Sequence, residues 1–476
     1  RELAFVMEST LWVLPVRPDG TPIGPARQVT REASDAPTWG GNSLLYLHNG
    51  TLRMNGRDVP ANLTYTPRHH QGVTVIHAGK LWDGESHGLK SDVDIVVVGD
   101  RIRAVEPHRA DRPSVDATGL TVMPGLVDMH NHQEMRSKYF GDRQGRLLLS
   151  YGITTTRSTG DAAYRALEDK ESLAAGARIG PRFFMTGEML EGPRLSWEFA
   201  RPVMSEAQLG LEVSRAKALD YDLVKTYQRL PAKWQADVTA DAHRLGVITT
   251  SHYLYPGVAH GVDMQEHLSG PTKWGFGFSR DMSSQGRVYD DAVQLFTRAG
   301  MPLSTTLFGS KALLADDPAM VTDPRLRALY TPAQQASLDA DLKCALGTGP
   351  CGFLSGNAEE TRREVAVFKR ILDQGGTVVA GTDPPLDNTA VSLHLNLRAM
   401  NKYGIDSYRV LRSATADAAQ VLGVARDLGT IRAGKIADLS FVVGNPLADV
   451  GAAANVRMVM RNGELHTVED LIGPFE

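Results

Sequence analysis

The strongest constraint on the fold is a regular alternation of short apolar strands and helical stretches between about residues 124 and 428. Helical periodicity is clearest at 205–220, 231–246 and 359–376. The candidate strands read LVDMHNH, GITTTRSTG, RFFMTGEM, DLVKTY, VITTSHY, VDMQEHL, PLSTTL and TVVAGTD. Such alternation indicates a parallel sheet with right-handed crossovers. Eight such strands predict an α/β fold built around a (β/α)₈ TIM barrel.

Two β-rich segments flank the predicted barrel. Residues 71–123 and 429–476 alternate apolar and polar positions around Gly and Asp turns, so we expect one composite β-sandwich split by the barrel at 124–428. Residues 1–70 read as two hairpin-like units and resemble blades of a β-propeller. They are too few for a closed propeller, and the alternative is an irregular β extension.

Composition excludes several classes of partner. The chain of 476 residues carries 51 Lys and Arg against 55 Asp and Glu, a net charge of −4, with no basic run that predicts nucleic-acid binding. No apolar stretch approaches the ~20 residues of a membrane helix, so we expect no membrane partner. A small-molecule substrate is the expected partner, and assembly into a homo-oligomer is left open.

The two cysteines and the first residue bear on where the chain works. Cys344 and Cys351, in CALGTGPC, are either two free thiols or a local disulfide, and the disulfide indicates an oxidising compartment. The chain begins at Arg1, so we expect a processed or excised piece of a longer product. Localisation is left open, with an exported or periplasmic setting preferred to the cytoplasm.

Polar side chains that suit metal binding end five of the predicted strands. In chain order they are His130, His132, Lys225, His252, His267 and Asp383. Taken alone, each residue could have an ordinary structural role, for example in a turn, in the core as a histidine or as a helix cap. Together they end the right kind of segment in one barrel, where C-terminal strand ends line the active site. The combination therefore predicts a metal site.

The spacing and chemistry of these residues suggest two ions. His130 and His132 are two positions apart and so share a strand face, with Asn131 pointing away. Imidazole and carboxylate are ligands that zinc prefers, so these histidines and Asp383 can hold one ion. His252 and His267 can hold a second. A charged Lys225 beside two metals is costly, but its carbamate is an anion that can bridge them.

At this point the sequence resembles the amidohydrolase superfamily. The resemblance runs from about Val73 to the end and rests on VMPGLVDMHNH, GITTTRSTG, DLVKTY, TTSHYLYP, MQEHLSG, VVAGTD and LGTIRAGKIADLSFVVGNPL. With a lysine on the fourth strand, the overall pattern is most similar to the imidazolonepropionase-like and prolidase-like members, which include dipeptidases and ochratoxinase-type carboxypeptidases. Deaminases of the superfamily have a His-x-x-Glu element that SHYLYPG lacks. Relatives with propeller repeats ahead of the barrel are known, which fits residues 1–70.

This resemblance implies a binuclear centre and a hydrolytic activity. One divalent ion, expected to be Zn²⁺, takes His130, His132 and Asp383, and the other takes His252 and His267. A carboxylated Lys225 and a hydroxide bridge them. The implied reaction is hydrolysis of an amide bond in a peptide, an N-acyl amino acid or a cyclic amide. The alternatives are a lactone or ester hydrolase and an inactive binding scaffold.

Further residues receive roles in this interpretation. Asp383 is expected to transfer the proton from the hydroxide to the leaving amine. Tyr227, two residues beyond Lys225, is the first candidate to brace the oxyanion, unless it is a rim aromatic that only packs. Tyr253 and Arg229 are candidates for holding the substrate, because an arginine suits a free carboxylate.

Overall fold

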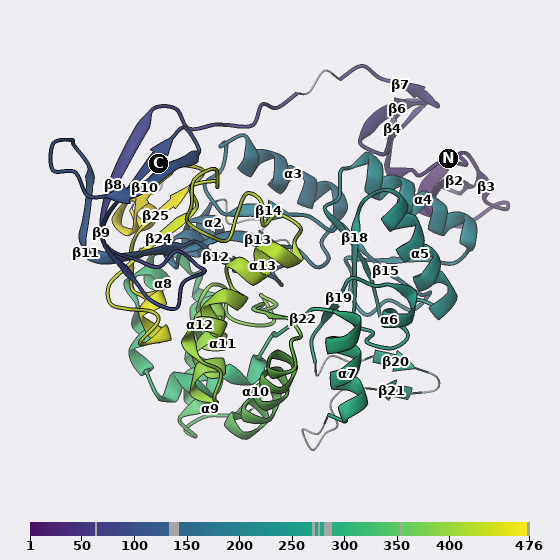
Figure 1. The fold of residues 1–476 in the computed structure, drawn as a ribbon. Helices are drawn as coiled ribbons and strands as arrows, with labels where there is room; N and C mark the ends of the chain where they lie inside the picture. The colour runs from purple at the N-terminus through teal and green to yellow at the C-terminus, as the bar shows by residue number, and fades with distance from the viewer. Residues whose placement is uncertain are drawn as a thin grey trace. The chain divides into compact units, whose positions relative to one another are not determined.

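The computed structural model forms two compact units that interleave along the sequence (Figure 1). The first unit holds Arg1–Thr66, Gly160–Glu168 and Met185–Asp263, and the second holds Pro67–Thr159, Asp169–Phe184 and Met264–Glu476. The described residues are 1–61, 64–132, 142–268, 272–274, 277–279, 288–352, 355 and 357–473, of which 272–274 and 277–279 are described as backbone.

The first unit begins with two small antiparallel sheets. One has the order β1-β2-β3, with β1 (Glu2–Met7), β2 (Thr10–Pro15) and β3 (Arg27–Gln28). The other has the order β4-β5-β6-β7, with β4 (Asp35–Gly40), β5 (Ser43–His48), β6 (Thr51–Met54) and β7 (Arg57–Asp58). Apolar side chains from both sheets pack into one core of Leu11, Val13, Leu44 and Tyr46. The start of the chain is therefore β-rich, as predicted.

The rest of the first unit is an α/β arrangement. Its parallel strands follow the order β16-β15-β17-β18, with bounds β15 (Met189–Glu191), β16 (Ala200–Pro202), β17 (Leu223–Thr226) and β18 (Ile248–Ser251). Every residue of β17 is buried, as expected for a strand covered on both faces. The helices are α4 (Glu206–Ala218), α5 (Ala232–Arg244) and α6 (Gly257–His260). Ser205 caps α4 by accepting a hydrogen bond from Gln208 N.

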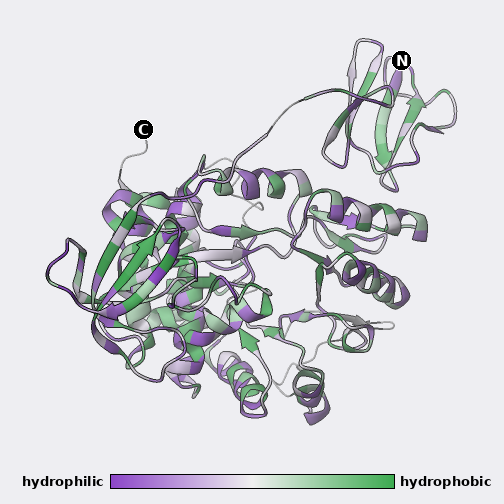
Figure 2. Cartoon of the chain, turned by 45° about the horizontal axis from the view of Figure 1, so that its top comes forward, coloured by the Kyte–Doolittle hydropathy of each residue, from purple (hydrophilic) through white to green (hydrophobic). Residues whose placement is uncertain are grey.

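The second unit contains one mixed sheet of seven strands, which Figure 2 shows to be largely apolar. Its order is β10-β9-β8-β11-β24-β25-β26, with bounds β8 (Val73–Leu81), β9 (Lys90–Val98), β10 (Arg101–Pro107), β11 (Val115–Pro124), β24 (Leu439–Val442), β25 (Val456–Arg461) and β26 (Glu464–Thr467). Strands β11 and β24 pair antiparallel, so the segments on either side of the long insertion form a single sheet. Its core includes Ile76, Ile95, Val122, Leu439 and Phe441.

Two further parallel runs carry the α/β part of the second unit. One is β12-β13-β14, with β12 (Leu126–Asp128), β13 (Ile153–Arg157) and β14 (Arg182–Phe184). The other is β19-β22-β23, with β19 (Met264–Glu266), β22 (Leu303–Ser304) and β23 (Val378–Val379). A separate antiparallel pair is formed by β20 (Thr272–Trp274) and β21 (Gly277–Ser279).

The helices complete the second unit. They are α2 (Arg143–Ser150), α7 (Asp290–Ala299), α8 (Pro324–Leu329), α9 (Pro332–Ala345), α10 (Ala358–Asp373), α11 (Val391–Lys402), α12 (Ser407–Ser413), α13 (Ala416–Val421) and α14 (Val468–Ile472), while α3 (Ala163–Ala174) runs from the first unit into the second. Short 3₁₀ helices are η1 (Phe308–Ala315), η2 (Pro318–Thr322) and η3 (Val450–Ala454). None of the helices among the described residues has the length and apolar character needed to cross a membrane.

Each of the eight predicted strand segments contains a strand, and the parallel pairing predicted for them is confirmed within each run. Within the described part of the chain these strands form open runs and no closed ring of eight. The structure thus has the α/β organisation that the alternation predicts, and the closed barrel stays a prediction.

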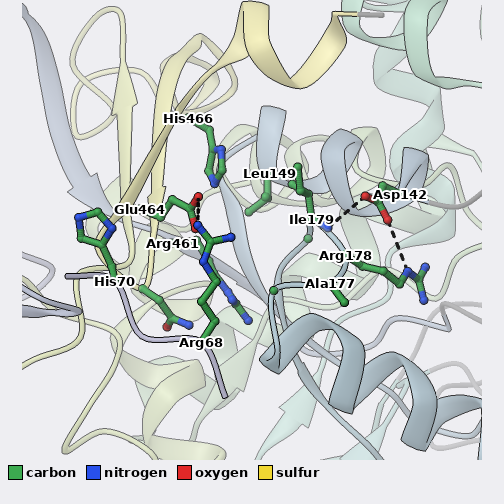
Figure 3. Close-up of a pocket in the computed structure, with 13 residues that line it drawn as sticks. Arg68, His70, Asp142, Leu149, Ala177, Arg178, Ile179, Arg461, Glu464 and His466 are labelled. Atoms are coloured by element: carbon green, nitrogen blue, oxygen red, sulfur yellow. Dashed lines mark hydrogen bonds and ion pairs between the residues drawn. The ribbon is translucent and has the colours of Figure 1, made fainter. Parts of the chain in front are cut away.

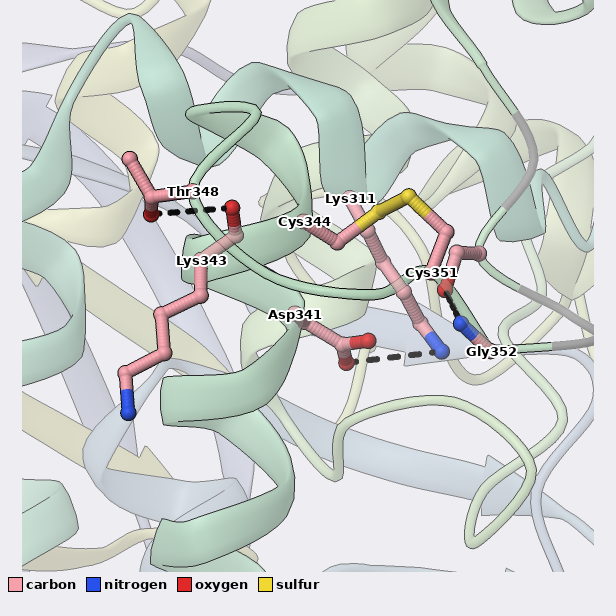
Figure 4. The surroundings of a disulfide bond; sticks show 8 residues. Lys311, Asp341, Lys343, Cys344, Thr348, Cys351 and Gly352 are labelled. Carbon is pink, nitrogen blue, oxygen red and sulfur yellow. Dashed lines mark hydrogen bonds and ion pairs between the residues drawn. A yellow bond between two sulfur atoms is a disulfide. The ribbon is translucent and has the colours of Figure 1, made fainter.

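Cys344 and Cys351 are joined by a disulfide that links the end of α9 to the turn after it (Figure 4). The same region contains an ion pair across 3.6 Å between Lys311 of η1 and Asp341 of α9. Of the two alternatives left open by the sequence, the structure contains the disulfide.

Candidate metal centre

Four of the predicted ligands lie together in the second unit. His130 and His132 follow β12, His267 directly follows β19, and Asp383 follows β23. Asp383 Oδ1 lies 3.4 Å from His130 Nε2 and 3.2 Å from His132 Nε2, and its Oδ2 lies 3.6 Å from His267 Nε2. All four side chains are buried. Segments far apart in the sequence therefore converge on one carboxylate.

The backbone around Asp383 explains how the groups come so close. Asp383 N donates a hydrogen bond of 2.7 Å to His130 O, which ties the two loops together. Asp383 has a φ of +70°, a left-handed conformation that is uncommon for a residue other than glycine. A Cβ at Gly381 would lie 2.8 Å from His130 Cβ, so this position requires glycine. The close approach is thus built into the GTD sequence.

A buried chain of polar contacts orients His130. Glu266, which directly precedes His267, has its Oε2 2.8 Å from His130 Nδ1. Arg157 donates to the other oxygen of Glu266 across 2.5 Å and to Met129 O across 2.6 Å. Arg157 and Glu266 are both fully buried. With Nδ1 committed to Glu266, the Nε2 atom of His130 faces Asp383.

Three threonines and a second aspartate contact the remaining parts of the site. Thr159 Oγ1 lies 3.0 Å from His132 Nε2, and Thr306 Oγ1 lies 2.5 Å from His267 Nδ1. Thr382 donates across 2.6 Å to Asp128, the last residue of β12. Burial raises the pKa of Asp128, and its hydrogen bonds only partly offset this effect. These contacts fix the loops that carry the four ligands.

Asp383 is held in its charged form. Burial acts to raise the pKa of this carboxyl group, but the adjacent His130 and His132 outweigh it and hold the pKa well below the ordinary value. A buried carboxylate among imidazoles is the donor set that a divalent ion such as zinc prefers.

The hydrogen bonding also fits a metal. Among the described residues, neither His130 Nε2 nor Asp383 Oδ1 has a hydrogen-bond partner, although both are buried. Buried polar atoms rarely lack a partner, and these two lie on facing sides of the cluster. His130, His267 and Asp383 each offer a ligand atom within 4.8 Å of the others. The residues present therefore fit a divalent ion.

The first unit contains the other predicted ligands, Lys225 and His252. Lys225 is 1% exposed and lies on β17, while His252 is 3% exposed and directly follows β18. The ring of Tyr227 lies 4.5 Å from the His252 ring and 5.3 Å from Lys225 Nζ. Within this unit the lysine, the histidine and the tyrosine are thus grouped at the ends of adjacent parallel strands.

The remaining predicted residues of the first unit make contacts of their own. The Tyr227 hydroxyl accepts hydrogen bonds from Trp197 Nε1 at 2.9 Å and from Gln228 Nε2 at 3.1 Å. Tyr253 donates its hydroxyl proton to Gln228 O. Arg229 pairs with the buried Glu191 across 3.0 Å. The roles proposed for Tyr227, Tyr253 and Arg229 stay predictions.

Sequence reasoning did not assign Arg157 and Glu266. A signal was present, because both residues are charged and stand in otherwise apolar strand segments, ITTTR and MQE. A charge in such a place needs a buried partner. The sequence does not show which partner, because the two strands are more than 100 residues apart and meet only in the folded chain.

Comparison with known proteins agrees with this geometry. Residues 258–466 match the amidohydrolase family. The imidazolonepropionase of Streptomyces avermitilis is 28% identical over 372 residues, covering 75% of this chain and 81% of that protein. Among solved structures, a Xaa-Pro dipeptidase with bound methionine in the active site aligns with a TM-score of 0.62 and 21% identity, covering 83% of this chain and all of the other. A putative prolidase from Bifidobacterium longum aligns with a TM-score of 0.61 and 23% identity, covering 83% and 94%.

The α/β fold, the converging His and Asp side chains and these matches together support an amidohydrolase superfamily member. Within the superfamily, the matches support the branch that contains the imidazolonepropionases, and the fold is similar to that of the prolidase-like structures.

Proposed function

We propose that the protein is a metal-dependent hydrolase that cleaves an amide bond in a small molecule, either peptide-like, N-acyl amino acid or cyclic amide. The observation that carries this proposal is the buried group of three imidazoles around the Asp383 carboxylate, in which two facing atoms lack hydrogen-bond partners within the described residues. Relatives named as imidazolonepropionases and a dipeptidase support hydrolysis of C–N bonds.

We further propose that the full centre holds two divalent ions, with zinc as the expected metal. His130, His132 and Asp383 supply the ligands of one ion. His267, together with His252 of the first unit, supplies the ligands of the other, and a carboxylated Lys225 is shared by both. Burial of Lys225 supports this, because desolvation favours the neutral amine that reacts with carbon dioxide.

Divalent ions bound by these residues lower the pKa of a coordinated water and polarise the scissile carbonyl. Asp383 is charged and lies within 3.2–3.6 Å of three imidazoles, so it is placed to accept a proton and return it to the leaving amine. Glu266 keeps His130 in one orientation, and Tyr227 is the side chain proposed to stabilise the developing oxyanion.

The proposal is tested by a substrate panel on metal-loaded protein. The panel holds Xaa-Pro and other dipeptides, N-acyl amino acids, cyclic amides and, as the competing class, lactones. We expect hydrolysis of at least one amide, loss of that activity on chelation and recovery when zinc or manganese is restored. Hydrolysis of lactones alone, or amide hydrolysis that a chelator leaves unchanged, would contradict it.

Lys225→Ala tests the bridging lysine. We expect metal content to fall and hydrolysis to drop by about 100-fold or more, since even groups that only hold a metal ligand in place are worth about 10- to 100-fold. Short carboxylic acids such as acetate should restore part of the activity by supplying the missing carboxylate. Lys233→Ala, on the exposed start of α5, is the matched control. Full activity in Lys225→Ala would refute the carbamate.

A further inference from the structure

A second group of charged residues surrounds a pocket of about 260 Å³ in the second unit, and the pocket shares no residue with the candidate metal centre. Its walls come from the end of β25, from β26, from α2, from the segment that follows α3 and from the chain near residue 68. Figure 3 shows Arg68, Arg461, Glu464 and His466 on one side, with Leu149, Ala177, Ile179, Asp142 and Arg178 on the other. One wall is thus charged, and the facing wall combines apolar side chains with the ion pair of Asp142 and Arg178.

The charges in this pocket do not cancel. Arg68 pairs with Glu464 across 3.0 Å, and Arg178 lies 3.5 Å from Asp142. Arg461 has no ion pair within the described residues. The one hydrogen bond that its side chain makes there runs from Nη1 to the backbone oxygen of Leu173 across 3.3 Å. One guanidinium is therefore left without a counter-charge.

The surroundings of Arg461 make its unpaired positive charge energetically unfavourable. Its Nε atom is buried and has no hydrogen-bond partner among the described residues. Burial, followed by the like charge of Arg182, lowers the pKa of Arg461 to about 10, and Asp438 and Glu464 offset this only in part. A mostly buried cation with an unpaired donor is stabilised by an anion brought in from solution.

The free edge of the guanidinium indicates the kind of anion. Nη1 bonds to Leu173, which leaves Nη2 and the buried Nε without a protein partner among the described residues, and a planar guanidinium suits the oxygens of a carboxylate. One unpaired positive charge suits a monoanion better than a dianion. The side chains of Leu149 and Ile179 offer an apolar surface for the rest of the ligand. The volume lies just below the ~300–1,000 Å³ of typical small-molecule sites, so the ligand is small.

We propose that this pocket is a binding site for a small organic monocarboxylate, held by Arg461 and covered by the apolar wall of Leu149 and Ile179. The proposal does not depend on the hydrolase function.

Titration of the metal-loaded protein with benzoate and with butyrate, monitored by calorimetry or ligand NMR, tests the site. We expect saturable binding that Arg461→Met weakens about tenfold or more, because hydrogen bonds to a charged group are lost. Arg457→Met is the matched control, since Arg457 is an exposed arginine on the same strand. It should bind like the wild type. Arg461→Lys keeps the positive charge but lacks the paired donors of the guanidinium, so it should bind the ligand more weakly than the wild type. This variant replaces Arg461→Met in the test if Arg461→Met does not fold.

Carboxylates also bind metal ions, so a second arm separates the two sites. Asp383→Asn removes a ligand of the candidate metal centre and should leave benzoate binding at the Arg461 pocket unchanged. Loss of binding in Asp383→Asn but not in Arg461→Met would overturn the proposal. So would the absence of binding to folded wild-type protein at high millimolar ligand, or binding of inorganic phosphate in place of both carboxylates.

Discussion

His130 is the residue whose surroundings explain most about the candidate metal centre. Its Nδ1 faces Glu266, its backbone oxygen accepts from Asp383, and its Nε2 is directed at the Asp383 carboxylate. An imidazole fixed on one nitrogen presents the other as a ligand in a defined direction. Glu266 in turn is fixed by Arg157. The geometry of the ligand thus depends on two residues that do not themselves reach the metal position.

Glu266→Gln is the substitution that tests this dependence. It keeps the size of the side chain but removes the charge that His130 Nδ1 and Arg157 both contact. We expect zinc affinity to fall about 10- to 100-fold, measured by competition with a chromogenic chelator, with the circular dichroism spectrum unchanged. Glu360→Gln, exposed at the start of α10, is the control and should bind zinc like the wild type. Equal affinities in the two variants would rule out an orienting role for Glu266.

The sequence identifies candidate ligands, but it does not identify the residues that hold them in place. His130, His132, His267 and Asp383 could be listed because each ends an apolar segment. That Glu266 contacts His130 could not be read from the sequence, because the contact joins β19 to the segment after β12, which lies more than 100 residues earlier in the chain. The positive φ of Asp383 could not be predicted either, because an aspartate at this position does not by itself indicate a left-handed backbone conformation.

Among the secondary-structure elements, α4 connects the β-rich start of the chain to the α/β part of the first unit. Asp35, the first residue of β4, pairs with Arg215 of α4 across 2.9 Å and with Arg201 across 3.3 Å. Glu212 pairs with Arg215 across 2.6 Å and accepts a hydrogen bond from Ser9. The charged residues of this network are largely buried. The N-terminal strands are therefore held to α4 by polar contacts as well as by packing.

Asp35→Ala should destabilise the first unit strongly. It removes one of the two carboxylates that pair with the buried guanidinium of Arg215 and leaves only Glu212, and losing one partner of a buried ion pair costs up to about 3–5 kcal/mol. Asp58→Ala breaks an exposed pair with Arg53 and should cost less than about 1 kcal/mol. Urea denaturation of both variants measures the difference. Equal midpoints for the two would show that the network does not stabilise the unit.

Helix α11 is nearly all buried, and it carries a histidine that responds to acid. His394 Nε2 lies 2.9 Å from Tyr151 O, and burial lowers the pKa of His394 to about 3 from an ordinary value of 6.5. Between these values the unfolded chain binds a proton on this residue and the folded chain does not. The free energy of unfolding therefore falls as the pH drops below about 6.5, and the contribution is complete above that pH.

His394→Gln removes this source of acid sensitivity. Between about pH 6.5 and about pH 4.5 the variant should lose up to about 3 kcal/mol less unfolding free energy than the wild type. Denaturant titrations at several pH values measure the slope. His87→Gln, at an exposed position, is the control and should leave the slope as it is. The same slope in His394→Gln as in the wild type would mean that His394 is not the responsible group.

For the molecule as a whole, the periodicity of apolar residues was the most informative part of the sequence. Alternation of strands and helices correctly indicated parallel α/β pairing at all eight segments, because apolar runs of this length must be covered on both faces. In the seven-stranded sheet β11 pairs with β24, which lies more than 300 residues later in the chain. The two segments share an alternation of apolar and polar residues, and this shared pattern predicted that they belong together. The closed barrel, the three-part domain division and the propeller-like character of residues 1–70 stay predictions.

The metal content of the purified protein tests the central claim most directly. Wild type and Asp383→Asn are saturated with zinc, freed of excess by gel filtration and measured by inductively coupled plasma mass spectrometry. We expect about two ions per chain in the wild type and a clear loss in Asp383→Asn, because Asp383 lies within 3.2–3.6 Å of three of the proposed imidazole ligands. A wild-type protein that holds no more zinc than Asp383→Asn would contradict it.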